Sequence, residues 1–234
     1  MTTTFDFKDG NGPVPAHQHP NGGGWVADTS TVAVSAFVGP DARVAGKARV
    51  SGKAQVYGNA KVSGNAVVSG KARVAGNARV SNDARVLGKA LVYGNALVAG
   101  KAGVYGNAQV FDNTQVFDYA VVTGNAQVYG NARVCGNAEV YGTAEVSGNA
   151  EVYGNAEVYG NAEVTKTPVR ISRSDGYDFI IVPCSDGKEC IIAGCRYFTY
   201  EEADEHWNKE HPMYAETSII LEALKNLYEL QKSL

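Results

Sequence analysis

Valine occupies every sixth position from Val26 to Val164 without a slip, over 24 consecutive hexads. The fourth residue after each valine is nearly always alanine, with Ser30 and Thr114 among the few substitutes. A period of six matches neither an α-helix, with about 3.6 residues per turn, nor the alternation of a plain strand. The chain must therefore turn once in each hexad.

Each hexad predicts a short strand followed by a corner. Valine suits a half-buried strand, and Gly-Asn, as in VYGNAEV at 152–158, tolerates the positive φ of a bend. If three strands complete one turn, positions three hexads apart stack at about 4.8 Å, and about eight turns make a prism about 38 Å tall. The pattern predicts an all-β solenoid, a parallel β-helix of triangular coils around one dry core of valine and alanine.

The two ends of such a solenoid need covers, because open edges would otherwise pair with other copies. Residues 1–25 contain Pro13, Pro15 and Pro20 and are expected to form an irregular capping segment, with Trp25 as the plug over the first coil. The repeat occupies residues 26–168, and residues 169–234 are expected to form a small C-terminal α+β module. With both ends covered, an end-to-end filament is not expected.

Within the module, the stretch from Val169 to Cys195 predicts a meander of three short strands, joined by Asp-Gly turns at 174–176 and 185–187. Thr199 and Glu202 form the pattern of a capping box that begins a helix, which Pro212 ends. A last helix from about Tyr214 carries an apolar stripe, expected to pack on the meander or the last coil: Ile220, Leu224, Leu227 and Leu230.

The motif V-x-G-N-A-x resembles the hexapeptide repeat of left-handed parallel β-helix proteins, over residues 26–169. The flanking segments GGGWVADT at 22–29 and TKTPV at 165–169 resemble those of bacterial and prophage hexapeptide-repeat proteins, some of them labelled transferases. The resemblance implies left-handed winding and a homotrimer. It also makes acyl transfer from a coenzyme A thioester an activity to weigh, although a fold alone does not determine function.

Aromatic residues next to the repeat valines fall into columns when every third hexad is aligned. One column holds Tyr57, Tyr93, Phe111 and Tyr129, and another holds Leu87, Tyr105, Tyr141 and Tyr159. Such columns stabilise a sheet through side-chain contacts, and a tall exposed apolar patch also marks an interface. The candidates for a subunit interface are Tyr57, Tyr93, Tyr105, Tyr129 and Tyr141.

Charge is segregated along the repeat: residues 26–103 hold 11 Lys and Arg against 3 Asp and Glu, while 104–166 hold 2 against 7. This arrangement serves solubility and steering, or the basic coils hold the phosphates of a nucleotide-like ligand. The net charge of −3 argues against a nucleic acid partner and gives no support to binding at an anionic membrane. The basic coils include Arg43, Arg49, Lys61, Arg73, Arg79 and Arg85, and the acidic coils Glu139, Glu145, Glu151, Glu157 and Glu163.

One coil, residues 110–121, departs from the consensus by replacing Gly-Asn with Asp-Asn and Asp-Tyr. Asp and Asn also visit turn conformations, so drift explains the change as well as function does. If the wall binds a ligand, the candidate residues are Phe111, Asp112, Asn113, Phe117, Asp118 and Tyr119.

The residues with the most reactive side chains lie outside the repeat or are sparse. Four cysteines are too few for a disulfide scaffold and are expected to be reduced thiols; Cys184, Cys190 and Cys195, with or without His206, have irregular spacing for a metal site, so neither metal nor cofactor is predicted. Acyl transfer needs a general base, usually histidine, and no hexad contains one. The four histidines, His17, His19, His206 and His211, lie near the ends.

The sequence therefore favours a non-catalytic binding or structural protein, a homotrimer whose remaining surface meets a protein or small-molecule ligand. Its resemblance to prophage proteins implies that the ligand is a host protein or a nucleotide-like molecule. The chain start lacks a basic flank with an apolar run, and no stretch approaches about 18 apolar residues, so a cytoplasmic protein without membrane contact is expected. The alternative is a coenzyme A-dependent acyltransferase of the hexapeptide-repeat superfamily.

Overall fold

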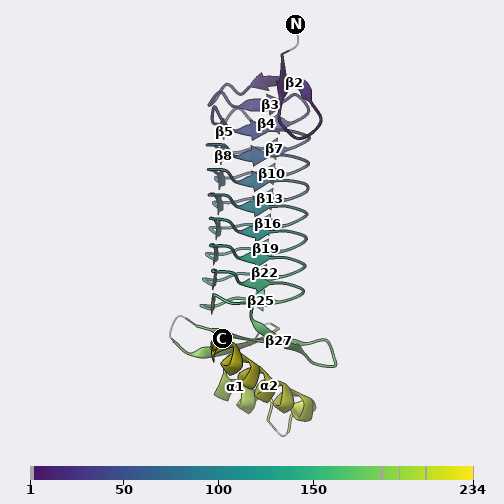
Figure 1. Cartoon of the computed structure of the whole chain (residues 1–234), viewed down its shortest axis with the longest axis vertical. Coiled ribbons are helices and arrows are strands. Elements are labelled where there is room, and N and C mark those ends of the chain that lie inside the picture. Colours follow the sequence, from purple (N-terminus) through teal and green to yellow (C-terminus); the bar gives the residue numbers. More distant parts are fainter. Residues whose placement is uncertain (1–2, 185–186, 195, 209, 234) are drawn as a thin grey trace.

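The computed structural model describes residues 3–184, 187–194, 196–208 and 210–233. A tall β-helix forms most of the molecule, with an N-terminal hairpin at one end and a compact module at the other (Figure 1). Among the described residues, no helix has the length and apolarity needed to cross a membrane.

Three parallel sheets of eight strands each make the wall of the β-helix. Face 1 comprises β3 (Trp25–Ala27), β6 (Arg43–Val44), β9 (Lys61–Val62), β12 (Arg79–Val80), β15 (Leu97–Val98), β18 (Gln115–Val116), β21 (Arg133–Val134) and β24 (Glu151–Val152). Face 2 comprises β4 (Thr31–Val32), β7 (Arg49–Val50), β10 (Val67–Val68), β13 (Arg85–Val86), β16 (Gly103–Val104), β19 (Val121–Val122), β22 (Glu139–Val140) and β25 (Glu157–Val158). Face 3 comprises β5 (Phe37–Val38), β8 (Gln55–Val56), β11 (Arg73–Val74), β14 (Leu91–Val92), β17 (Gln109–Val110), β20 (Gln127–Val128), β23 (Glu145–Val146) and β26 (Glu163–Val164).

The register confirms the period inferred from the sequence. Val44 pairs with Val62, and Val92 with Val110, so each strand hydrogen-bonds to the strand three hexads away. Every repeat valine except Val32 is buried, and the repeat alanines are buried with them in one continuous core. The predicted parallel β-helix of about eight coils is thus confirmed, whereas its left-handed winding stays a prediction of the resemblance.

The corners explain why glycine follows the valine. Gly106 has φ +66°, and a Cβ there would lie 3.0 Å from the carbonyl oxygen of Gly124 on the next coil. Asparagines after the glycines form a ladder at one corner, in which each amide donates to the next at 2.9–3.1 Å. The ladder contains Asn59, Asn77, Asn95, Asn113, Asn131 and Asn149.

The N-terminal segment is regular, so the prediction of an irregular cap is wrong. β1 (Thr4–Asp6) and β2 (Pro13–Gln18) form an antiparallel hairpin, and β2 pairs with β3 and so extends face 1. Pro13 and Pro15 stand opposite Asp6 and Thr4 of β1, but the β2 to β3 pairing begins only at Ala16, so no N–H is needed from either proline on the β3 side.

Trp25 does not plug the first coil, as the sequence suggested. It belongs to a small separate cluster with Phe7, and its ring stacks on Phe5 at 4.4 Å. Residues 19–24 cover the core instead: Gly24 donates to the Val38 carbonyl at 2.9 Å, and the Asn21 amide donates to the Ala36 carbonyl at 2.8 Å.

The C-terminal module has four antiparallel strands rather than three, because a further strand follows the predicted meander. Its elements are β27 (Val169–Ser172), β28 (Asp178–Pro183), β29 (Glu189–Ala193), β30 (Arg196–Thr199), α1 (Tyr200–His206) and α2 (Tyr214–Ser233). The capping box at α1 is confirmed: the Thr199 hydroxyl accepts from Glu202 N at 3.2 Å, and Thr199 N donates to the Glu202 carboxylate at 2.7 Å. Ser185 and Asp186, of the second predicted turn, lie outside the described residues.

The module's sheet has two apolar faces. Ile180, Val182 and Ile192 continue the valine core of the β-helix, whereas Phe179 and Ile181 face the helices. The predicted cover over the last coil is therefore present.

The stripe predicted on α2 is only half right. Ile220 and Leu224 are buried, but Leu227 and Leu230 are 46% and 58% exposed, and Leu221 and Tyr228 are buried in their place. From Leu224, a step of three residues leads to Leu227 and a step of four leads to Tyr228, so the spacing alone allows either residue to continue the buried stripe. Burial of the Tyr228 ring removes more apolar surface from water than burial of a leucine side chain.

The cysteine prediction is also wrong in part. Cys184 and Cys190 form a disulfide, with their Cα atoms 6.3 Å apart. The hairpin of β28 and β29 places Cys190 opposite Val182, so Cys184 comes within reach diagonally across the two strands. Cys135 is free, and Cys195 lies outside the described residues. No group of three potential metal ligands occurs in the part of the chain that the structure describes.

Candidate functional site

The structure does not gather the six ligand candidates of the unusual coil into one cluster. Phe111, Asp112 and Asn113 follow a face 3 strand, whereas Phe117, Asp118 and Tyr119 follow a face 1 strand and lie at the next corner. The first three all have partners within the wall. Phe111 stacks between Tyr93 at 4.8 Å and Tyr129 at 5.1 Å, and Asn113 belongs to the asparagine ladder.

The two aspartates stand where the repeat has glycine. Asp112 and Asp118 have φ of 59° and 60°, the left-handed conformation of the glycine corners. Their carboxylates each accept a hydrogen bond at 3.2 Å from a backbone N–H of the next coil, that of Gly130 or Gly136. Both aspartates thus stabilise the corner by bonding to the next coil, a role that their departure from the Gly-Asn consensus did not indicate.

The aromatic pair at the second corner contacts basic side chains. The Arg133 guanidinium lies 5.4 Å from the centre of the Phe117 ring, and the Lys101 ammonium lies 4.9 Å from that of Tyr119. Tyr119 is 58% exposed, which leaves its ring open to a partner. The role of all six residues in ligand binding stays a prediction.

The aromatic columns are interrupted by Ala75 and Thr123, and the rings that do stack on one another shield part of each other from solvent. Tyr141 stacks on Tyr159 at 4.7 Å, and its hydroxyl donates to Glu157 at 2.9 Å; burial, together with this carboxylate, raises the pKa of Tyr141. Tyr105 lies across Gly103, where a Cβ would meet its ring. Of the interface candidates only Tyr57 counts as exposed, at 37%.

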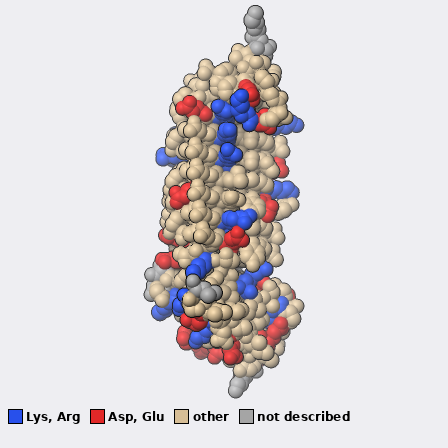
Figure 2. Space-filling view, in the orientation of Figure 1, with Lys and Arg blue, Asp and Glu red and all other residues tan. Residues whose placement is uncertain are grey.

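The charges of the wall differ sharply between its two halves. None of the Lys and Arg residues in 26–103 forms an ion pair with any residue that the structure describes. Farther along face 1, by contrast, Arg133 pairs with Glu151 at 2.8 Å. Figure 2 shows Lys and Arg side chains gathered in a vertical file toward the N-terminal end of the face in view.

The basic half has cavities on all three faces, and the one on face 3 measures about 510 Å³ and is lined by Asn21, Ser35, Phe37, Lys53 and Gln55. The cavity on face 2 measures about 630 Å³ and is lined by Thr29, Thr31, Lys47, Arg49, Asn65, Val67, Asp83 and Arg85. The cavity on face 1, which we call the hairpin groove, measures about 280 Å³. The N-terminal hairpin bounds it, and its lining is Phe7, Lys8, Asp9, Arg43, Ala45, Lys61, Val62, Ser63, Arg79, Ser81 and Leu97.

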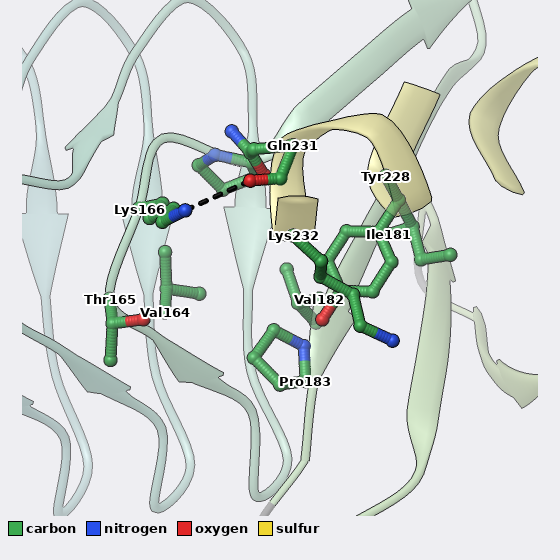
Figure 3. A pocket seen from close by; sticks show the side chains of 10 residues that line it. Val164, Thr165, Lys166, Ile181, Val182, Pro183, Tyr228, Gln231 and Lys232 are labelled. Carbon is green, nitrogen blue, oxygen red and sulfur yellow. Dashed lines mark hydrogen bonds between the residues drawn. The ribbon is translucent and has the colours of Figure 1, made fainter. Parts of the chain in front are cut away.

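Another cavity, of about 220 Å³, lies between the last coil and α2 (Figure 3). Its polar groups are engaged within the chain. The Lys166 ammonium donates to the Gln231 carbonyl at 2.9 Å, and the Lys232 ammonium pairs with Glu189 at 2.8 Å and Glu229 at 3.0 Å. This cavity is therefore a packing gap between the β-helix and the module rather than a candidate binding site.

Among known protein families, the chain matches a model of a β-solenoid repeat. The YdcK beta solenoid repeat matches residues 54–70 and 126–142. No curated protein matches the chain.

Solved structures of similar shape include UDP-N-acetylglucosamine acyltransferase from Campylobacter jejuni, 13% identical over 61% of this chain and 71% of that one, with a TM-score of 0.25. A hexapeptide transferase family protein from Anaplasma phagocytophilum is 12% identical over 87% of this chain and 92% of that one, with a TM-score of 0.28. Such low identities and scores support no argument about activity.

The histidines do not converge. His17 is about half exposed, and its Nδ1 lies 2.7 Å from Asp28 Oδ1. His19 is buried at the start of the loop of residues 19–24, with Nδ1 3.2 Å from the Asn21 carbonyl oxygen. His206 and His211 lie together in the module at the other end, and burial, with the charge of Arg196, lowers the pKa of His206.

Sequence reasoning missed the hairpin groove. The groove exists because β1 and β2 fold back onto face 1, whereas the prolines of this segment predict an irregular conformation. The alternation Phe5-Asp6-Phe7-Lys8 was a signal for a strand with one apolar side, and the structure uses it in this way: Phe7 is buried and Phe5 stacks on Trp25.

Proposed function

We propose that this protein is a non-catalytic binding protein, in which a rigid β-helix presents a basic surface to an anionic, nucleotide-like ligand and assembles as a homotrimer. The observation that carries the proposal is the charge of residues 26–103: their Lys and Arg side chains form no ion pair with any described residue. Such a surface raises the local concentration of anions.

The rest of the wall supports the role of a frame. Its outward side chains contact their equivalents on neighbouring coils, as in the asparagine ladder and the stacks of Tyr93, Phe111 and Tyr129. No loop interrupts the coils over residues 26–164, so nothing on them forms a lid over a reacting group. Such a frame is preorganised for binding, because little ordering is needed when a ligand arrives.

The ligand part of the proposal is tested by calorimetric titration of the full chain with tripolyphosphate, ATP and coenzyme A at low and high salt. We expect the oligophosphates to bind and salt to weaken the binding, because the contacts are ionic. Absence of heat with every anion at low salt would refute this part.

The assembly part is tested by light scattering of the eluting protein, with an expected mass three times the chain mass of 24.7 kDa. Tyr57→Lys, at the exposed end of an aromatic column, should shift the trimer toward monomer. Tyr119→Lys, which is more exposed but is not an interface candidate, should leave it intact. A wild-type mass of one chain would exclude the trimer, and ligand binding would then be decided by the calorimetric titration alone.

One observation favours the alternative, acyl transfer from coenzyme A. The contact of His17 Nδ1 with Asp28 orients the imidazole as a general base requires, with the ring half exposed. An assay of acetyl-coenzyme A with a panel of amine and hydroxyl acceptors decides between the two. We expect no turnover; turnover that His17→Gln abolishes and Lys47→Gln retains would establish the enzyme instead.

A further inference from the structure

Three basic side chains stand in a file on face 1, which we call the basic file: Arg43, Lys61 and Arg79. They occupy the outward position of β6, β9 and β12, which pair in register, so neighbouring members are about 4.8 Å apart along the sheet. Like charges directly opposite each other destabilise a sheet. The file therefore carries an energetic cost that the valine core does not require.

The remainder of face 1 shows that this cost is avoidable. Farther along the same outward row, Arg133 is followed by Glu151, and the two pair at 2.8 Å. The basic file has no acid in its row, although any of its three positions could carry one without disturbing the core. Asp6 of the hairpin is hydrogen-bonded to Lys8 and also lies near Arg43, but none of the three basic side chains forms an ion pair with a described residue. An external anion is the partner that would offset the repulsion.

The N-terminal hairpin turns this row of charges into a cavity. Phe5 stacks on Trp25 at 4.4 Å, and the Arg43 guanidinium lies 5.3 Å from the centre of the Phe5 ring, so the hairpin and the top of the file are held together. The resulting hairpin groove, about 280 Å³, is close to the lower limit of about 300 Å³ for small-molecule pockets.

The lining of the groove indicates the chemistry of its ligand. Guanidinium groups bind phosphate oxygens with two parallel hydrogen bonds, and the Ser63 and Ser81 hydroxyls add neutral donors beside the file. The partly exposed Leu97 offers apolar contact to the remainder of a molecule, whereas Val62 is buried in the core. The hairpin groove and the larger cavity on face 2 each have one aspartate in the lining, but the cavity on face 2 is less suited to an anion because Val67 separates Arg49 from Arg85 in its row.

We propose that the hairpin groove binds the oligophosphate group of a small organic molecule, with Arg43, Lys61 and Arg79 along the phosphates and Leu97 beside the organic part. This site rests on the proposed function and deepens it by naming the place and the ligand class. A file of only three cations, followed by the uncharged Leu97 and Gln115, matches a short linear polyanion better than a nucleic acid strand.

Calorimetric titration of the full chain with tripolyphosphate and with ATP tests the site. Arg79→Gln and Lys61→Gln should each weaken tripolyphosphate binding by about tenfold or more, since each removes a charged donor. Arg85→Gln on face 2 is the matched control and should change the affinity less than about twofold.

Asp9→Asn gives a result that loss of folding cannot mimic. Asp9 lines the groove and opposes an anion there, so this variant should tighten tripolyphosphate binding by about two- to fivefold. Leu97→Ala should weaken ATP binding and leave tripolyphosphate binding unchanged.

The outcomes separate the two levels of the proposal. If the wild type binds and only Arg85→Gln weakens binding, the groove is the wrong site while the proposed function stands. If the wild type binds no anion, both fail. A single-stranded oligonucleotide that binds more tightly than ATP and loses affinity in Arg79→Gln would overturn the small-molecule ligand in favour of nucleic acid.

Discussion

The β-helix and the C-terminal module bury apolar side chains in opposite ways. In the β-helix every coil repeats the contacts of the coil before it, so Val92 meets Val110 and Val110 meets Val128. In the module each contact is unique and often distant in the sequence: Arg173, near the start of the module, donates to the Thr217 hydroxyl of α2 at 2.9 Å. One local rule builds the first region, and the second depends on particular partners.

This difference has a consequence for stability. A solenoid is held by contacts between neighbouring coils, so a defect disturbs the coils on either side of it first. The module joins this system through its sheet, because Ile180, Val182 and Ile192 belong to the same core as the valines. We expect the module and the last coils to unfold together.

The largest effect is expected from a charge in the repeated core. Val110→Asp should cost several kcal/mol, because an unpaired carboxylate would be buried among valines on both neighbouring coils. Gln109→Asp, one residue earlier on the outer side of the same strand, should cost less than about 0.5 kcal/mol. Urea unfolding followed by circular dichroism measures both, and equal midpoints would contradict the inside and outside assignment of the hexad.

The module offers a similar comparison between two leucines of α2. Leu224→Ala should cost about 2–5 kcal/mol because Leu224 is fully buried. Leu227→Ala should cost less than about 0.5 kcal/mol, because Leu227 is 46% exposed. Trp207, buried in the same cluster as Leu224, reports the transition by its fluorescence. A larger loss for Leu227→Ala would restore the stripe predicted from the sequence.

A smaller effect is expected at the corners of the β-helix. Gly106→Ala should cost about 1–2 kcal/mol, because φ there is +66° and the new Cβ would lie 3.0 Å from the Gly124 carbonyl oxygen. Asp112→Gly keeps the corner conformation and removes only one exposed hydrogen bond, so it should change stability less. Thermal unfolding compares the two, and a neutral Gly106→Ala would show that the corner tolerates a side chain.

The smallest effect is a dependence of module stability on pH. The pKa of His206 in the folded chain lies below its ordinary value, because burial disfavours the charged ring. The free energy of unfolding should therefore be constant above about pH 6.5 and fall as the pH drops below it. His206→Gln should remove part of this slope in denaturant titrations read through Trp207. A slope that increases in the variant would contradict this assignment.

The sequence by itself determined the repeat and the fold class, because burial in the β-helix depends only on which of six positions a residue occupies. The small residues at Gly106 and Ala108 likewise follow from crowding between coils. The capping box at Thr199 could be read for the same reason, since its hydrogen bonds join residues close together in the chain.

Only the tertiary structure decided the features that depend on distant partners. It folded β1 and β2 into a hairpin on face 1, exchanged Leu227 for Tyr228 on the buried side of α2, and brought Cys184 to Cys190. The hairpin groove is of this kind, because its two sides are brought together by the stack of Phe5 on Trp25, residues whose contact no local pattern specifies. Local periodicity fixes which side of the wall a residue faces, whereas contacts across the chain fix what it meets there.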